Sequence, residues 1–313
     1  MNEERVQSYR AVERRLWDHY GATPREHFFD LATPRVRVRV QEIGAGPPVL
    51  FVHGGPNAGS TWAALVAHLQ DFRCLMLDRP GCGLSEAVDY AAYSARDLPS
   101  LAADVLTSVL DALGIERLAI VGSSLGGAFA FWLAEARPER VVRVVQEGLP
   151  AFVEGMRTPL FMRMLMVPPL GRMIARQRST ATVGRFILRQ IGHGASLDAG
   201  RFPPVFLDWY LHLMNDTETM RNDVAVIQML STWRGPRSEL IYGAEFLRRL
   251  RQPTLFLWGE ADSFGGVEVG RRAAAALPDA TFKSFAASGH LPWLDDPETR
   301  ARLVRDFLQA DAA

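Results

Sequence analysis

The pentapeptide GSSLG at residues 122–126 constrains the fold of this chain more than any other feature. It follows a short apolar run, residues 118–121, and precedes a stretch of helical composition, residues 128–136. A strand that turns sharply into a helix lifts its central residue to the C-terminal edge of a sheet, and small residues on either side relieve the crowding. The pattern predicts such a turn with Ser124 at its tip. The alternative is a glycine-rich turn that only packs strand on helix.

Short apolar runs alternate with amphipathic stretches throughout the first half of the chain. Strands are expected at residues 35–40, 49–52, 74–77, 118–121 and 141–145, and helices at about 1–20, 98–113 and 128–136. Residues 35–40 alternate Arg and Val, as in a half-exposed strand, whereas the fully apolar run at 49–52 is typical of a strand buried on both faces. Strands that alternate with helices indicate βαβ units, so we expect an α/β protein with a mostly parallel sheet.

The alternation stops near Gly148 and resumes at Thr254 with expected strands at 254–258 and 281–285 and helices at 269–277 and 298–308. Residues 150–240 hold eight of the ten methionines and show helical spacing without strands. We interpret this segment as a helical cap over the sheet. Residues 1–149, with the N-terminal helix, and residues 241–313 are then the two parts of the core.

The composition is that of an ordinary globular protein, with 48% apolar and 22% charged residues in a chain of 313. Lys and Arg (35) balance Asp and Glu (35), so nucleic acid and anionic membranes are set aside as partners unless a local patch exists. The two cysteines lack zinc-site spacing and favour a reduced protein. The N-terminus resembles no secretory signal, and no apolar run is long enough to span a membrane, so a cytoplasmic location is the default expectation.

A serine hydroxyl needs a base in contact, and the base needs an orienting acid. His290 comes directly after the last expected strand, and Asp262 comes directly after the strand before it. Parallel strands bring the loops at their carboxyl ends to one edge of the sheet. We therefore predict a catalytic triad of Ser124 as nucleophile, His290 as base and Asp262 as acid.

Two other carboxylates compete with Asp262 for the role of acid. Glu260 is two residues away, and Glu147 follows the strand before the cap and could reach the histidine from the other side. The position of Asp262 after the penultimate strand favours it. The remaining histidines on helical or cap segments are interpreted as surface or packing residues; they are His19, His27, His68, His193 and His212.

The tetrapeptide HGGP at residues 53–56 directly follows the expected strand 49–52. Glycine lets the backbone approach a ligand closely, and Pro56 has no N–H to donate. In the strand–turn–helix template, an amide of this loop joins the amide after the nucleophile to form an oxyanion hole. We assign these donors to Gly55 and Leu125, and expect His53 to hold the loop by hydrogen bonds.

Five stretches in this order and spacing resemble the α/β-hydrolase fold family, specifically its serine-nucleophile branch with a helical cap. They are HGGPNAGSTW (53–62), DRPGCGLSE (78–86), GSSLGG (122–127), LFLWGEAD (255–262) and SGHLPWLDDP (288–297). The resemblance implies a mostly parallel eight-stranded sheet, flanked by helices, with the cap inserted after the sixth strand. It also implies that Asp78 stabilises a loop.

The resemblance separates branches of the family. Haloalkane dehalogenases and epoxide hydrolases carry Asp where this chain has Ser124, so those reactions are not expected. HGGP and GCG resemble proline iminopeptidases, but Asn57 departs from their loop, and the cap carboxylates they need could only be Glu154 or Glu218. The serine turn is also shared with hydrolases that cleave C–C bonds.

The cap is rich in methionine, which suits an irregular apolar pocket, although packing of the cap on itself explains many of these residues. The side chains expected to contact substrate are Trp62, Ser123, Met162 and Trp209. We expect a serine hydrolase that cleaves an ester, thioester or lactone of a small, uncharged and partly apolar molecule, with no metal or cofactor. The alternatives are an aminopeptidase, a C–C bond hydrolase and a non-catalytic receptor. The oligomeric state is left open.

Overall fold

A computed structural model describes residues 2–310. The expected N-terminal helix begins at residue 1 and the second part of the core ends at residue 313, so residues 1 and 311–313 of these predictions lie outside the described residues. One sheet of eight strands has the order β1-β2-β4-β3-β5-β6-β9-β10. The strands are β1 (Arg25–Ala32), β2 (Arg35–Ile43), β3 (Pro48–Val52), β4 (Arg73–Leu77), β5 (Leu118–Ser124), β6 (Val141–Pro150), β9 (Thr254–Gly259) and β10 (Ala280–Phe285). Strand β2 pairs antiparallel with both neighbours and all other pairs are parallel, which confirms the expected fold class.

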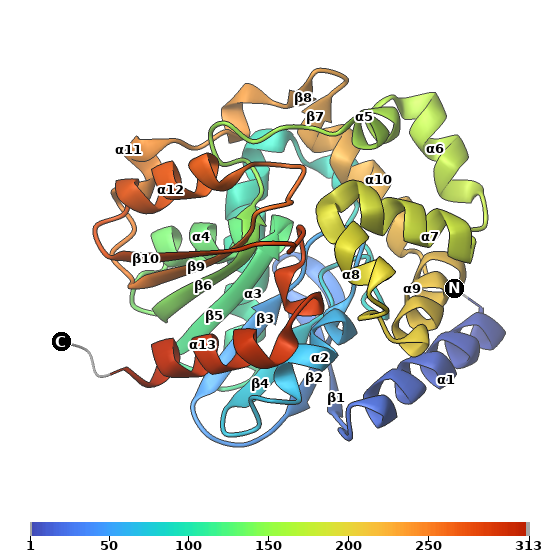
Figure 1. The fold of residues 1–313 in the computed structure, drawn as a ribbon, viewed down its shortest axis with the longest axis horizontal. Coiled ribbons are helices and arrows are strands. Elements are labelled where there is room, and N and C mark those ends of the chain that lie inside the picture. The colour runs from blue at the N-terminus through green and yellow to red at the C-terminus, as the bar shows by residue number, and fades with distance from the viewer. Residues whose placement is uncertain (1, 311–313) are drawn as a thin grey trace.

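Helices pack on both faces of this sheet (Figure 1). Those of the core are α2 (Ala63–Val66), α3 (Leu98–Ala112), α4 (Leu125–Ala136), α11 (Ala244–Leu247), α12 (Val267–Ala276) and α13 (Pro297–Gln309). Helix α13 contacts α2 in front of the sheet in the view shown, and α3 contacts α4 behind it. Strands β3, β4, β5 and β9 are almost wholly buried, which explains their continuous apolar sequences.

Between β6 and β9 the chain forms a group of helices at one end of the sheet (Figure 1). They are α5 (Leu160–Met166), α6 (Pro168–Arg176), α7 (Ala181–Leu188), α8 (Gly194–Asp198), α9 (Pro204–Asp216) and α10 (Thr219–Leu230). A short hairpin of β7 (Ser231–Thr232) and β8 (Gly235–Pro236), which the sequence did not predict, follows α10. We refer to residues 150–240 as the cap.

The N-terminal helix α1 (Glu3–His19) packs against the cap helix α9. Trp209 of α9 donates from Nε1 to the hydroxyl of Tyr9 at 3.3 Å, and Ser8 donates to Asp216 at 2.8 Å. The same helix also reaches the core, because Glu13 accepts from the buried guanidinium of Arg39 at 2.7 Å. Helix α1 therefore joins the two parts of the molecule.

Asp78, at the end of β4, holds the loop that follows it. One carboxylate oxygen accepts from the amide of Gly59 at 2.7 Å, and the other accepts from the amide of Leu84 at 2.9 Å and from Arg39 Nε at 2.7 Å. This confirms the loop-stabilising role expected for Asp78. The loops at this edge of the sheet are therefore fixed by buried charge-assisted hydrogen bonds.

Candidate active site

Ser124 occupies a strained turn between β5 and α4. Its φ of 53° and ψ of −121° are rare for a residue with a side chain. The turn also requires glycine on both sides, because a Cβ on Gly126 would lie 2.0 Å from the carbonyl oxygen of Val52, and one on Gly122 would lie 2.6 Å from that of Gly126. The predicted sharp turn is thus present, and it leaves Ser124 only partly buried.

Ser124 lines a cavity of about 90 Å³ between the core and the cap. The space is narrow beside the roughly 300–1,000 Å³ typical of pockets for drug-sized ligands. Its lining comprises Gly55, Ser124, Leu125, Leu149, Ala151, Phe152, Met156, Thr158, Met162, Met166, Asp223, Val226, Ile227, Leu230, Ser231, Pro236 and Phe264. Apolar side chains dominate, and Asp223 is the one charged residue in this lining.

His290 and Asp262 form a buried pair at the carboxyl ends of the last two strands. Nδ1 of His290 lies 2.8 Å from Oδ2 of Asp262, and Oδ1 of Asp262 accepts from the amide of Phe264 at 2.8 Å. The ring of Phe264 lies against the imidazole with 4.4 Å between centroids, and Phe264 also lines the cavity of Ser124. Neither His290 nor Asp262 is among the lining residues of that cavity, and Phe264 is the residue that connects the pair to it.

The two glycines after β3 lie close to the serine. A Cβ on Gly54 would lie 2.6 Å from the Cβ of Ser124, and Gly55 lines the cavity together with Leu125. Leu125 is the first residue of α4, where amide groups have no partner within the helix. Both backbone positions expected to form an oxyanion hole therefore border the same space as Ser124.

His53 is held inside the loop and does not line the cavity. Its Nε2 accepts from the amide of Arg79 at 3.1 Å, so Nδ1 carries the proton and donates to the carbonyl of Gly54 at 2.7 Å. Burial, with the nearby Arg79, lowers the pKa of His53 well below its usual range. The neutral imidazole fixes the glycine loop, as expected.

The competing carboxylates take other positions. Glu147 is fully buried, and neither of its oxygens has a hydrogen-bond partner. Burial raises the pKa of Glu147 to about 8, which favours a neutral carboxylic acid. Glu260 is exposed and accepts from the hydroxyl of Ser284 at 2.8 Å. Asp262 is the candidate acid that contacts His290.

Of the four side chains expected to contact substrate, only Met162 lines the cavity. Trp62 is fully buried and stacks on Trp293 at 4.0 Å between centroids. Trp209 is fully buried against α1, and Ser123 is fully buried within the sheet. The assignment of these three residues to the substrate pocket is corrected, because they fill the interior of the protein.

Asp223 is a residue of the cavity that the sequence did not reveal. One carboxylate oxygen accepts from Arg79 at 3.2 Å, while the other, Oδ2, is buried without a partner. A Cβ on Gly55 would lie 2.8 Å from Oδ2, so the carboxylate borders the glycine loop. Burial raises the pKa of Asp223, and the guanidinium of Arg79 opposes this shift.

A second buried histidine–aspartate pair supports the loop of His290. Nδ1 of His193 lies 2.9 Å from Asp295, whose other oxygen accepts from the amide of Gly289 at 2.9 Å. Nε2 of His193 accepts from the amide of Leu291 at 3.2 Å. The sequence predicts His193 only as a surface or packing residue, because nothing near it in the chain shows that it touches this loop.

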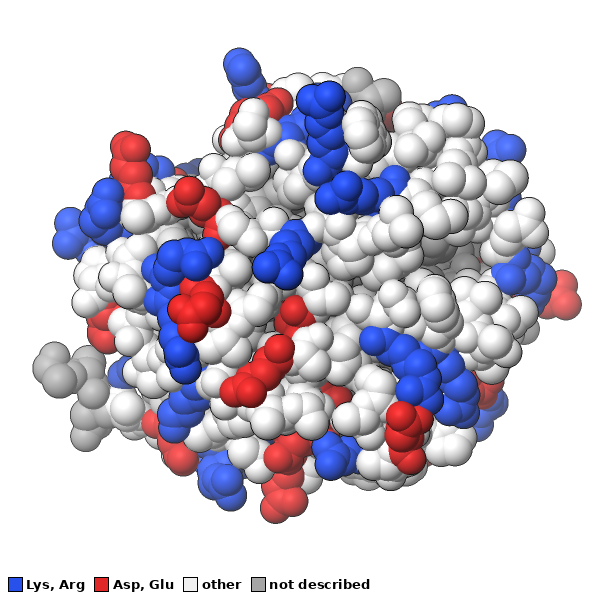
Figure 2. All heavy atoms as spheres, turned by 45° about the horizontal axis from the view of Figure 1, so that its top comes forward, with Lys and Arg blue, Asp and Glu red and all other residues white. Residues whose placement is uncertain are grey.

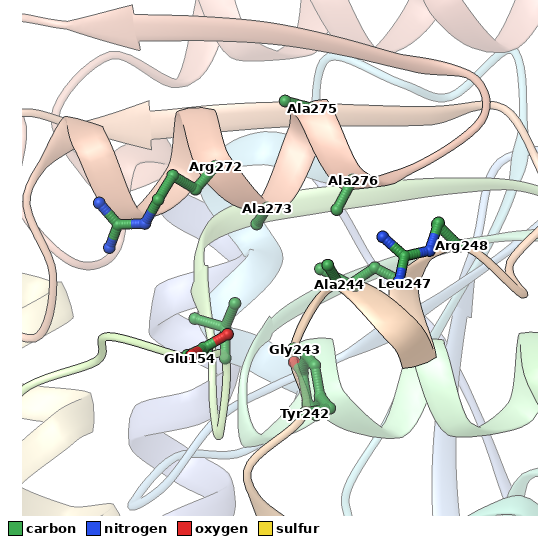
Figure 3. A pocket seen from close by; sticks show the side chains of 11 residues that line it. Glu154, Tyr242, Gly243, Ala244, Leu247, Arg248, Arg272, Ala273, Ala275 and Ala276 are labelled. Atoms are coloured by element: carbon green, nitrogen blue, oxygen red, sulfur yellow. The ribbon is translucent and has the colours of Figure 1, made fainter.

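A wider cavity of about 360 Å³ lies elsewhere, where α11, α12 and the start of the cap meet (Figure 3). Its side chains include Glu154, Tyr242 and Arg272, and no residue of the predicted triad lines it. Glu154 therefore does not face Ser124, and Glu218 is bound to Arg221 on the surface at 3.0 Å.

Within residues 2–310, no group of three or more His, Cys, Asp or Glu side chains is placed to hold a metal ion.

The strained serine turn on a largely parallel sheet defines a protein of the α/β class with a hydrolase-type fold. The sequence profile of the alpha/beta hydrolase fold matches residues 47–297, and the chain belongs to this family.

Several known proteins are similar over nearly the whole chain. A 2-hydroxy-6-oxononadienedioate/2-hydroxy-6-oxononatrienedioate hydrolase of Paraburkholderia phymatum is 29% identical, over 87% of this chain and 91% of its own. A 2-hydroxy-6-oxo-6-phenylhexa-2,4-dienoate hydrolase of Burkholderia cepacia is 27% identical, over 87% and 91%. A carboxylesterase from Bacillus subtilis, 20% identical, superposes with a TM-score of 0.78 over 99% of this chain and 100% of its own.

Proposed function

We propose that this protein is a serine hydrolase that cleaves an ester, thioester or lactone of a small and partly apolar molecule. The observation that carries the proposal is the strained turn that presents Ser124 to an apolar cavity. Gly55 and Leu125 border that cavity, and Phe264, which also lines it, packs against His290 of the His290–Asp262 pair. These are the components of acyl transfer through a covalent intermediate.

The proposed reaction begins when His290 removes the proton of Ser124, whose Oγ attacks the substrate carbonyl carbon. The amides of Gly55 and Leu125 stabilise the oxyanion. Asp262 binds Nδ1 of the imidazole, leaves Nε2 for proton transfer and stabilises the charged ring. His290 then protonates the leaving group, and water releases the acyl group from Ser124.

The test is reaction with a small fluorophosphonate, followed by intact-mass spectrometry. We expect a single adduct on the wild-type protein and on Ser123→Ala, whose hydroxyl is buried, and none on folded Ser124→Ala. An adduct that persists in Ser124→Ala contradicts the nucleophile assignment. A folded wild-type protein that forms no adduct but binds a small ligand tightly favours the receptor alternative.

A C–C bond hydrolase is the second candidate, because relatives 26–29% identical carry the names of dienoate and dienedioate hydrolases. A dienedioate is a dicarboxylate, and proteins bind carboxylates with cationic side chains. The lining of the Ser124 cavity contains Asp223 and no Lys, Arg or His. This lining favours a hydrolase of esters over a C–C bond hydrolase. It predicts faster turnover of neutral p-nitrophenyl esters than of 2-hydroxy-6-oxo dienoates.

The aminopeptidase alternative needs a cap carboxylate that can hold a free amine. Glu154 and Glu218, the two candidates from the sequence, do not line the Ser124 cavity. Asp223 does line it, and its unpartnered oxygen could accept from an ammonium group. Turnover of prolyl anilides faster than of matched neutral esters would support this alternative.

A further inference from the structure

Positive charge is concentrated in one segment of the cap. Residues 155–190 contain seven arginines and no Asp or Glu, whereas the whole chain is neutral. All seven arginines are exposed. Arg189 pairs with Asp198, but none of the other six has an ion-pair partner among residues 2–310. The overall balance of charge therefore conceals a local excess of exposed positive charge in this segment, which is the condition under which an anionic partner becomes relevant.

Large apolar side chains are exposed on the same segment. Leu160 is 77% exposed and Met164 is 43% exposed on α5, and Met173 is 54% exposed on α6. Trp233, which follows directly after the strand β7 that contacts α5, is 61% exposed. In Figure 2 the surface over α5 and α6, at the upper right, is largely uncharged with basic side chains at its edge. We call these four residues, together with Arg163 of α5 and Arg172 and Arg176 of α6, the docking face.

An open groove of about 420 Å³ between α6 and α10 adjoins the docking face. Arg172, Arg176 and Arg221 line it together with apolar side chains such as Val224 and Met229. Arg221 is bound to Glu218 at 3.0 Å, which leaves Arg172 and Arg176 as the cations without an acidic partner. A groove with this lining suits an anionic head group attached to an apolar chain.

We propose that the docking face binds the surface of an anionic lipid bilayer. Exposed leucine, methionine and tryptophan beside arginine have the composition of segments that lie in a membrane interface. Arginine buries its aliphatic stem in such an interface while its guanidinium reaches the head groups. Within residues 2–310 no helix is long and apolar enough to cross a membrane, so docking at the surface is the mode that fits.

Helix α5 links the docking face to the cavity of Ser124. Leu160 and Met164 face outward, whereas Met162 and Met166 line the cavity of Ser124. A bilayer that draws the outer side chains into its interface acts directly on the wall of the cavity. The proposed docking does not depend on the proposed hydrolase activity, because binding can be measured with the Ser124→Ala variant.

Trp233 provides an internal reporter of docking. The other six tryptophans of the chain are buried, so changes in accessible tryptophan fluorescence report on Trp233. Vesicles of phosphatidylcholine containing phosphatidylglycerol should shift its emission to the blue, and brominated lipids should quench it. Vesicles of phosphatidylcholine alone should have little effect, and added salt should weaken binding. A Trp233→Phe variant should remove the signal while sedimentation with the vesicles persists.

Two variants separate the components of the docking face. R172Q/R176Q should lower the partition coefficient about fivefold for each charge removed. L160S/M173S should abolish the blue shift. The control R271Q/R302Q removes two exposed arginines of α12 and α13 and should bind like the wild type. Absent binding to anionic vesicles, or binding that the control weakens equally, overturns the proposal. The proposal is also overturned if soluble polyglutamate changes the fluorescence of Trp233 as much as the anionic vesicles do and this change persists in L160S/M173S. That result would favour an anionic protein partner.

Discussion

Nδ1 of His290 and Oδ2 of Asp262 lie 2.8 Å apart in a buried environment. The second oxygen of Asp262 accepts from the amide of Phe264, so the carboxylate is fixed from both sides. Such an acid sets the tautomer of the imidazole and stabilises its charged form when a proton is transferred. No comparable contact reaches Glu147, whose oxygens have no hydrogen-bond partner.

The first prediction concerns the choice between these two acids. Asp262→Asn should lower kcat by about 10³- to 10⁴-fold, because an amide cannot stabilise the imidazolium and favours the wrong tautomer. Glu147→Gln should keep kcat within a few-fold of the wild type. Steady-state kinetics on one neutral ester, with thermal unfolding as a check of folding, make the comparison. A larger loss in Glu147→Gln would reverse the assignment.

The second prediction concerns stability against pH. The pKa of Glu147 is about 8 in the folded protein, whereas the ordinary pKa of a glutamate, which applies to the unfolded chain, is 4.5. Between these two pH values the folded state keeps a proton that the unfolded state releases. The stability due to this group is fully present below pH 4.5. It should fall by roughly 1.4 kcal/mol per pH unit until about pH 8. Urea unfolding at several pH values measures this slope.

Glu147→Gln is the variant that tests this slope. Glutamine does not titrate, so the variant should lose less stability between pH 5 and pH 8 than the wild type does. The comparison uses the change in the free energy of unfolding between pH 5 and pH 8. A free-energy cost of burying the amide that does not depend on pH therefore cancels. Equal slopes in both proteins would show that Glu147 is not the group responsible.

The core and the serine turn were predictable because their determinants are local in the chain. Buried parallel strands have continuous apolar sequences, and the serine turn needs glycine at fixed offsets from Ser124. Strand β1 was missed because it is an edge strand with intermediate burial and no clear alternation. Only its antiparallel pairing with β2 makes Arg25–Ala32 a strand.

The cavity lining was harder to predict, because it depends on how the cap lies on the core. Trp62 and Trp209 are of a residue type that is common in ligand pockets, but both are fully buried in the interior of the protein. Asp223 and His193 have no motif around them, and their roles arise from contacts with Arg79 and Asp295, each more than one hundred residues away in the chain. Sequence spacing alone carries no information about such contacts.

The third prediction is that His193 positions the loop of His290. It binds Asp295 and the amide of Leu291, and the carbonyl of Ile191 accepts from the amide of His290 at 2.9 Å. His193→Gln should lower kcat by up to about 10²-fold with little change in KM, because the base is displaced while the cavity remains. His212→Gln, on a half-buried histidine of α9, is the matched control. An unchanged kcat in folded His193→Gln would leave the residue a purely structural role.

The fourth prediction is that Asp223 selects against anionic acyl groups. Its Oδ2 is buried without a partner at the edge of the Ser124 cavity, beside Gly55. Because burial raises the pKa of this carboxyl, Asp223 keeps its proton to a higher pH than an exposed aspartate. Discrimination between a neutral ester and a carboxylate-bearing ester of the same length should therefore increase as the pH rises and Asp223 ionises.

Asp223→Asn should remove this pH dependence. Asparagine retains an oxygen that can accept from Arg79, but it carries no charge toward the substrate. The ratio of kcat/KM for the carboxylate-bearing ester to that for the neutral ester should rise about tenfold at high pH, since one repulsive contact of roughly 1–2 kcal/mol is lost. Both esters must be compared in the same variant, because the unpaired charge of Arg79 lowers stability and affects both rates. A ratio that stays constant with pH in the wild type would mean that the carboxylate does not face the acyl group.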